Sequence, residues 1–238
     1  MNTPGLSFVM PYLFEYSEGL VLFDAGYGTK NATSALENEL KTLGYRISDI
    51  NTFLVSHAHP DHLGMVGWLK KKVPQVNLVM HKREEEWLKD RWFKDNHWEE
   101  RSNEWLLKHG ITQEEIHVDY PVSGNGKNGG LGLDFKLTYN KVKNFFTREN
   151  SDGNWRRSFE MDILPDRTLE DGEVIEFGEW RLKAVWTPGH TPGHLCIYDA
   201  KNNVMLTGDH VLPRITPNVS LHVEDESTQR SPLAEYTS

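Results

Sequence analysis

The sequence predicts an α/β protein in which helices pack against β-sheets. Apolar runs of strand length alternate with helix-like segments along the chain. Several of these runs are followed by a turn and then by histidine or aspartate, an order typical of strands whose ends carry a functional site. We find no internal repeat of fixed period.

Most of the regular pattern lies in the first half of the chain. Strands are predicted at 8–16, 20–24, 52–55 and 77–81. Helices are predicted over 32–43 and 63–72 from their apolar spacing. In the second half, 174–177 and 180–186 flank Gly178-Glu179 and predict a hairpin.

Residues 57–62 read His-Ala-His-Pro-Asp-His and directly follow the apolar run 53–55. Neutral imidazole and carboxylate are the ligands that Zn²⁺ and Fe²⁺ prefer. His57 and His59 would share one face of the loop, and Asp61 and His62 would come round the turn beside them. A polar loop that merely caps a helix is the alternative, but a cap needs only one such residue. The motif therefore predicts a metal site with room for a second ion.

Three other segments repeat the order of strand, turn and ligand-type residue. They deliver Asp24 after 19–23, His190 and His194 in a Thr-Pro-Gly-His-Thr-Pro-Gly-His loop, and Asp209 in Leu-Thr-Gly-Asp. Each segment taken alone could be an ordinary turn. Because strand ends converge at one rim in such sheets, their agreement favours a single shared site.

These motifs, in this order, resemble those of the metallo-β-lactamase superfamily and, within it, the glyoxalase II-like hydrolases. The resemblance covers roughly residues 8–238 and is weakest between 82 and 165. It implies an αββα sandwich, a single domain across 1–238, and an insertion or lid around 82–165. It also implies site roles: a first metal on His57, His59 and His190, a second on Asp61 and His62, a bridge by Asp209, an orienting carboxylate in Asp24, and a bracing, non-ligand histidine in His194.

The resemblance implies an enzyme, a metal-dependent hydrolase with two divalent metal ions. Zinc is the expected metal, with iron or manganese as alternatives. A hydroxide between the ions would attack a thioester, lactone or small ester, with Asp61 as the acid/base residue. True β-lactamases of this superfamily typically place cysteine or another residue at the position of Asp209. The single cysteine, Cys196, lies in an apolar run and is interpreted as a core residue.

One departure from the family pattern concerns the second metal. Members usually supply a further histidine from a late strand, and this chain lacks that segment, which leaves His210 and His222 as candidates. The ending, 231–236, has the pattern of a helix start. We therefore expect a chain truncated at its C-terminus, with the second half of the sandwich incomplete.

Composition limits the partners. A net charge of −9 over 238 residues disfavours broad phosphate binding, so a small-molecule substrate is expected and nucleic acid is not. One cysteine fits a cytoplasmic protein, and no apolar run is long enough for a membrane span. The oligomeric state stays open. The alternatives are a phosphodiesterase or ribonuclease using basic and aromatic residues at 141–157, a catalytically weak truncated binding protein, and a mononuclear iron oxygenase.

Overall fold

The computed structural model describes residues 10–89, 103–104, 106–108, 110–112, 163–219 and 231–238. The chain divides into two compact units, one made of residues 1–95 and 158–238 and the other of residues 96–157. The first unit contains every element discussed below. In the second unit, the described residues include short helical stretches at 103–104 and 106–108.

The first sheet has five strands in the order β1-β2-β3-β4-β5. Its strands are β1 (Tyr12–Tyr16), β2 (Gly19–Phe23), β3 (Ile50–Leu54), β4 (Asn77–His81) and β5 (Arg167–Leu169). β1 is antiparallel to β2, and the other pairs are parallel. β2 and β4 are buried along nearly their whole length, as expected for strands covered on both faces.

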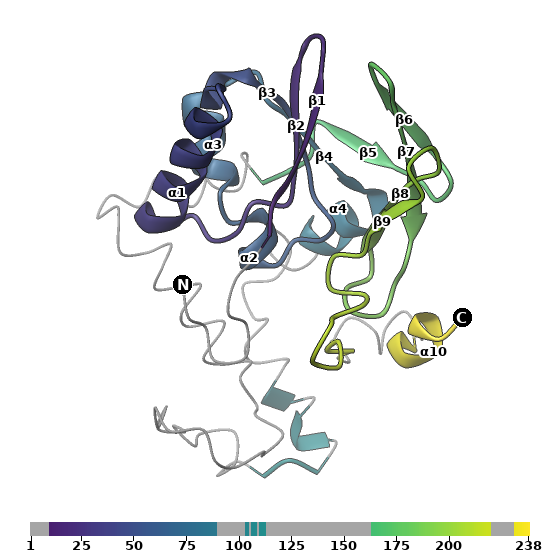
Figure 1. Ribbon diagram of the computed structural model, residues 1–238. Helices are drawn as coiled ribbons and strands as arrows, with labels where there is room; N and C mark the ends of the chain where they lie inside the picture. Colours follow the sequence, from purple (N-terminus) through teal and green to yellow (C-terminus); the bar gives the residue numbers. More distant parts are fainter. Residues whose placement is uncertain (1–9, 90–102, 105, 109, 113–162, 220–230) are drawn as a thin grey trace. The chain divides into compact units, whose positions relative to one another are not determined.

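The second sheet is fully antiparallel and has the order β6-β7-β8-β9 (Figure 1). It contains β6 (Val174–Phe177), β7 (Trp180–Trp186), β8 (Leu195–Asp199) and β9 (Val204–Leu206). The β6–β7 hairpin is confirmed, with Phe177 opposite Trp180 across the turn.

The helices are α1 (Lys30–Thr42), a 3₁₀ turn η1 (Ile47–Asp49), α2 (Pro60–Leu63), α3 (Val66–Lys72), α4 (Lys82–Lys89) and α10 (Pro232–Tyr236). The Thr29 hydroxyl accepts a hydrogen bond from the Ala32 N–H and so caps α1. Most of the helix predicted at 63–72 is observed as α3, whereas Leu63 is the last residue of the separate helix α2. A Cβ at Gly64, between them, would lie 2.1 Å from the Pro60 carbonyl oxygen, so only glycine fits there.

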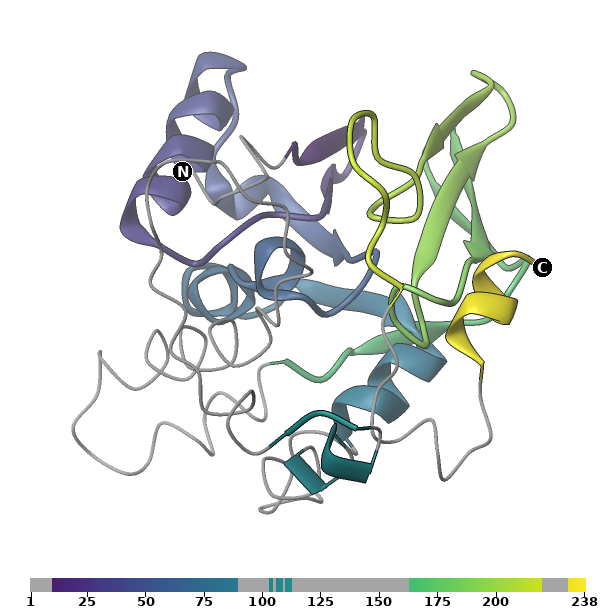
Figure 2. The ribbon, with the colours of Figure 1, turned by 90° about the horizontal axis from the view of Figure 1, so that it is seen from below.

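Two buried apolar clusters hold these layers together. One joins α1 and α3 to the first sheet through residues such as Leu36, Leu40, Leu69 and Phe53. The other fills the space between the two sheets and contains residues from both, among them Val21, Leu54, Val79, Leu182 and Ile197. Figures 1 and 2 show α1 and the β6–β9 sheet on opposite sides of the first sheet. The predicted α/β class is therefore confirmed.

The strand register places the site. Phe23 of β2 pairs with Leu54 of β3, and Leu54 pairs with Val79 of β4, so these parallel strands end close to one edge. In the second sheet, β7 and β9 each pair antiparallel with β8 and therefore run in the same direction. The segments after β2, β3, β7 and β9 are the four that the sequence analysis singled out.

Predicted elements agree closely with those observed. The predicted strand at 8–16 begins at Tyr12 among the described residues, with residues 8–9 outside them, and the strand predicted at 77–81 matches β4. The start of a helix near the end of the chain is observed as α10. Within the described ranges, no helix combines the length and apolar character that crossing a membrane requires.

His81, the last residue of β4, gives a testable pH dependence. Its ring stacks on Trp186 at 5.5 Å between centroids, and its Nδ1 accepts the Arg83 N–H. Burial lowers the pKa of His81 to about 4, and Glu170 offsets only part of that effect. An unfolded chain protonates this histidine near pH 6.5, so below that pH the unfolded state binds the proton first and stability falls.

We expect the free energy of unfolding to fall by about 1–2 kcal/mol between pH 7 and pH 5 because of the protonation of His81 in the unfolded state. His81→Phe keeps a ring against Trp186 but does not titrate. Urea unfolding at the two pH values should give a smaller loss in this variant than in the wild type. Equal losses in the two proteins would contradict the assignment.

Candidate metal centre

All eight predicted site residues lie in the described part of the chain, and the structure brings them together. His57 and His59 follow β3, while Asp61 and His62 lie on α2. The other four are Asp24 after β2, His190 and His194 in the loop between β7 and β8, and Asp209 after β9.

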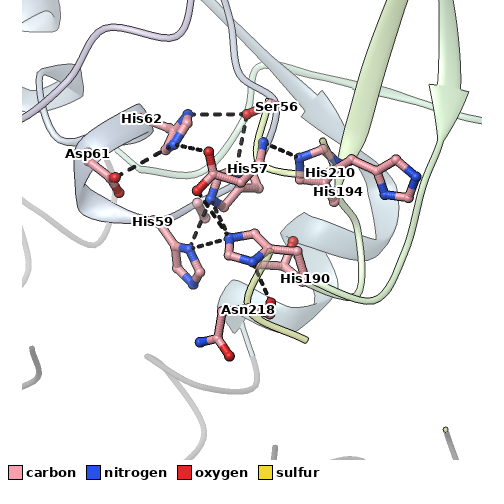
Figure 3. A network of polar contacts seen from close by, with 12 residues as sticks. Ser56, His57, His59, Asp61, His62, His190, His194, His210 and Asn218 are labelled. Carbon is pink, nitrogen blue, oxygen red and sulfur yellow. Dashed lines mark hydrogen bonds and ion pairs between the residues drawn. The ribbon is translucent and has the colours of Figure 1, made fainter. Parts of the chain in front are cut away.

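Three imidazoles converge on one point. His57 Nε2 lies 2.9 Å from His59 Nδ1 and 3.1 Å from His190 Nε2, and the distance from His190 Nε2 to His59 Nδ1 is 3.0 Å. Figure 3 shows the three rings pointing toward one another. Ligand atoms placed tetrahedrally around zinc at roughly 2.0–2.1 Å are about 3.3 Å apart, close to these separations.

Hydrogen bonds on the far sides of two rings fix where their protons are. The Nδ1 of His190 lies 2.7 Å from the Asn218 carbonyl oxygen, which can only accept. Ser56 Oγ donates to Asp24 Oδ2 at 2.8 Å, so it accepts from His57 Nδ1 at 3.0 Å. The Nε2 lone pairs of His57 and His190 therefore face each other. A cation bound between them would stabilise this arrangement.

A second group of donors surrounds His62. Its Nε2 lies 3.3 Å from Asp209 Oδ1 and 3.7 Å from Asp61 Oδ2. Asp209 Oδ2 in turn lies 3.6 Å from His190 Nε2, so this carboxylate spans both groups. The donor atoms of His57, His59 and His190 all lie within 4.8 Å of one another, as do those of His57, His62 and Asp209. The residue types and spacing fit two divalent cations side by side.

Asp24 contacts both Ser56 and His62 through its carboxylate. Its carboxylate accepts hydrogen bonds from the Ser56 N–H, the Ser56 hydroxyl and His62 Nδ1, each at 2.8 Å. The contact with Nδ1 directs Nε2 of His62 toward Asp61 and Asp209. Asp24 itself has φ of 51°, a left-handed conformation that aspartate tolerates better than most residues. The orienting role of Asp24 stays a prediction.

His194 has protein partners at both ring nitrogens. The Asp209 N–H donates to His194 Nε2 at 3.1 Å, so Nδ1 carries the proton and donates to Thr187 Oγ1 at 2.8 Å. His194 therefore fixes the backbone at Asp209, as a bracing residue would. Cys196 is buried beside Thr187, and burial raises the pKa of its thiol, which fits the predicted core position.

Burial controls protonation in the first group. It lowers the pKa of His57 well below the ordinary value, and it lowers the pKa of His190, where the Asn218 carbonyl opposes the effect. Both rings are thus neutral at physiological pH, the form that binds metal.

The second group has the opposite balance. Burial alone would lower the pKa of His62, but Asp24 and Asp209 outweigh it and hold that pKa well above the usual range. Burial raises the pKa of Asp61, whereas the hydrogen bond and charge of His62 outweigh burial at Asp209 and lower its pKa. A proton on His62 occupies the position that a second cation would take.

Ser56, Thr187 and Glu84 also contact the site residues or the loops that carry them and were not predicted from the sequence. Ser56 and Thr187 each lie beside a motif residue, a position that indicates little by itself. Glu84 is fully buried on α4 and bonds to both ligand loops, but it lies in a Lys-Arg-Glu-Glu-Glu run that is typical of a solvated helix face.

The two candidates for a late histidine ligand have different outcomes. His210 lies beside His194 and Tyr236, with ring centroids at 6.1 and 4.6 Å, and belongs to neither donor group. Figure 3 shows it to one side of the convergent rings. His222 and the basic-aromatic segment 141–157 lie outside the described residues.

The chain is similar in sequence to known proteins. The chain is 26% identical over 230 residues to "Probable metallo-hydrolase YqjP" of Bacillus subtilis, covering 96% of the chain and 60% of that protein. A shorter match, 35% identical over 49 residues, is to "Acyl-coenzyme A thioesterase MBLAC2" of Gallus gallus and covers 21% of the chain and 18% of that protein.

A solved structure gives the same result for the fold. A metallo-beta-lactamase family protein from Thermus thermophilus superposes with a TM-score of 0.62 at 25% identity, covering 95% of the chain and 61% of that protein. The chain thus spans about three fifths of the length of these two long-matching relatives. The sequence profile of the Metallo-beta-lactamase superfamily matches residues 4–237. With its His and Asp cluster at the edge where this fold gathers its strand ends, the chain belongs to the metallo-β-lactamase superfamily.

Proposed function

We propose that the protein is a metal-dependent hydrolase with two divalent metal ions, acting on a thioester, lactone or small ester. One observation carries the proposal. The Nε2 atoms of His57 and His190 lie 3.1 Å apart with their lone pairs facing each other, and His59 lies beside them. His57, His59 and His190 would hold the first ion, and Asp61 and His62 the second, with Asp209 between them. Zinc suits this set of nitrogen and carboxylate ligands.

The chain's own residues would prepare the site. With a cation bound in place of the proton on Nε2, Asp24 would keep the other proton on Nδ1 of His62 and so present the Nε2 lone pair to the site. His194 fixes the Asp209 backbone. Asp61, whose pKa burial raises, would exchange a proton with the attacking water and act as the acid/base residue. Two bound metal ions would supply a water of lowered pKa and polarise the substrate carbonyl.

The substrate class rests on three supports. The motifs resemble those of glyoxalase II-like hydrolases, and the short match is to a protein named as an acyl-coenzyme A thioesterase. An acidic chain with a net charge of −9 also suits a small substrate better than a nucleic acid. We therefore place thioesters first, followed by lactones and simple esters.

The domain organisation is part of the proposal. We propose that one domain contains the whole site and that the region around 82–165 is inserted into it. In support, residues 1–95 and 158–238 form one compact unit although 62 residues separate them in the chain (96 to 157).

The test combines metal analysis with a substrate panel. Mass spectrometry should find about two metal ions per chain, and chelation should abolish turnover until metal is restored. The panel should contain an acyl-coenzyme A, an acylglutathione, a lactone, an aryl ester and a labelled RNA. Metal-dependent cleavage of the RNA alone, or two bound ions without any turnover, would contradict the proposed substrate class.

A further inference from the structure

Glu84 is a buried carboxylate that bonds to both loops carrying the first group of histidines. Its side chain is completely inaccessible to solvent, near the start of α4. Oε1 accepts the Ala58 N–H at 2.7 Å. Oε2 accepts the Thr191 hydroxyl at 2.8 Å and the Gly193 N–H at 2.9 Å. One carboxylate therefore uses each of its oxygens for a different loop.

The positions of these three donors are informative. Ala58 lies between His57 and His59, Thr191 follows His190, and Gly193 precedes His194. The donors are 26, 107 and 109 residues from Glu84 in the sequence. Glu84 thus sets the spacing between the two loops whose imidazoles converge.

Burying the Glu84 carboxylate costs free energy, which favours a specific role for its charge and hydrogen bonds over simple packing. A buried carboxylate carries a desolvation penalty that hydrogen bonds must offset, and an apolar residue would fill the same space without it. The three donors are neutral groups of the ligand loops. The backbones are also in close contact, since a Cβ on Gly193 would lie 2.1 Å from the Glu84 nitrogen.

We propose that Glu84 is a positioning residue that holds His59 and His190 at the separation a shared metal ion requires. The proposal rests on the metal centre proposed above and adds a residue outside the ligand set. Hydrogen-bond partners that support metal ligands in this way typically account for about 10- to 100-fold in metal affinity. Glu84 supports two ligand loops at once, so its loss should move both histidines.

The main variant is Glu84→Gln, which keeps the shape of the side chain. Glutamine has one acceptor oxygen and one amide NH₂, so it can serve only one loop and places N–H against N–H at the other. Glu86→Gln is the matched control, because Glu86 lies on the same helix, is exposed, and has only a 3.7 Å ion pair with Arg83 in the described structure.

Metal affinity is the primary measurement, made by titrating the metal-free full chain with Zn²⁺ and Co²⁺ against a competing chelator. We expect Glu84→Gln to weaken binding at the proposed site of His57, His59 and His190 by about 10- to 100-fold and to alter the visible Co²⁺ spectrum, while Glu86→Gln matches the wild type. Thermal unfolding of the metal-free proteins separates metal affinity from stability. An unchanged affinity and spectrum in Glu84→Gln, even with lower stability, would overturn the proposal.

Thr191→Val provides a second variant in case Glu84→Gln does not fold. It removes one donor to Oε2 and keeps the side-chain volume, so we expect a smaller loss of affinity, about 3- to 10-fold. Wild-type affinity in this variant, with Glu84→Gln unfolded, would also overturn the positioning role. Failure of the wild type and Glu86→Gln to bind either ion would instead overturn the metal centre itself.

Discussion

Replacing His57 by alanine is expected to reduce bound metal from about two ions per chain to one or none and to lower hydrolysis by more than about 100-fold. His57 belongs to both groups of donor atoms that lie within 4.8 Å of one another. Its Nε2 faces His59 and His190, and its Nδ1 is held by Ser56. Losing a residue that merely supports a ligand costs about 10- to 100-fold, so losing a proposed ligand itself should cost more.

The control for this experiment is His210→Ala. His210 lies one residue from Asp209, but its ring packs near His194 and Tyr236 and is not among the convergent donors. It should keep its metal and its turnover. Mass spectrometry of both purified variants, with turnover of the best substrate, decides the matter. Full metal content in His57→Ala would mean that the convergent nitrogens are not the binding site.

The proximity of the candidate site residues could be predicted because ligand chemistry and strand direction coincide in the sequence. The motif at 57–62 follows β3, and Asp24 follows β2, whose end pairs with that of β3. The register therefore brings Asp24 to within 2.8 Å of His62. In the second sheet, β7 and β9 run in the same direction, so His190 and Asp209 reach the same edge.

Supporting residues were harder to predict because their role depends on distant partners. Glu84 stands in a run of charged residues that is typical of a solvated helix face, yet it is fully buried. One of the two loops to which it bonds lies more than 100 residues away along the chain. Ser56 joins Asp24 to His57 only after the two strands have paired. No local sequence pattern indicates such contacts.

The ends of helices and strands were hard to predict for the same reason, because they also depend on contacts with distant residues. The helix predicted at 63–72 is divided after Leu63, where Gly64 lies against Pro60 and the glycine-containing loop that follows Asp24. Strand β5 has three residues, Arg167 to Leu169, and is too short for an alternating pattern to indicate it. It forms because β4 offers a parallel edge.

Gly193→Ala is expected to destabilise the fold by at least about 3 kcal/mol, a large effect for one methyl group. The added Cβ would lie 2.1 Å from the Glu84 nitrogen and 2.6 Å from its Cα. Both are backbone atoms of α4, so no side-chain rotation relieves the overlap, and the loop and helix must separate. Separation would also lengthen the hydrogen bond from the Gly193 N–H to Glu84.

Gly67→Ala is a matched control, since Gly67 lies within α3 and a Cβ there meets nothing within 4 Å. This substitution should stabilise the protein by up to about 1 kcal/mol, because alanine has less conformational entropy to lose in a helix. Urea unfolding of the two metal-free variants would give free-energy changes of opposite sign. If Gly193→Ala unfolds like the wild type, α4 and the ligand loop are not in backbone contact. The positioning role of Glu84 would then lose its structural basis, because its three hydrogen bonds require that contact.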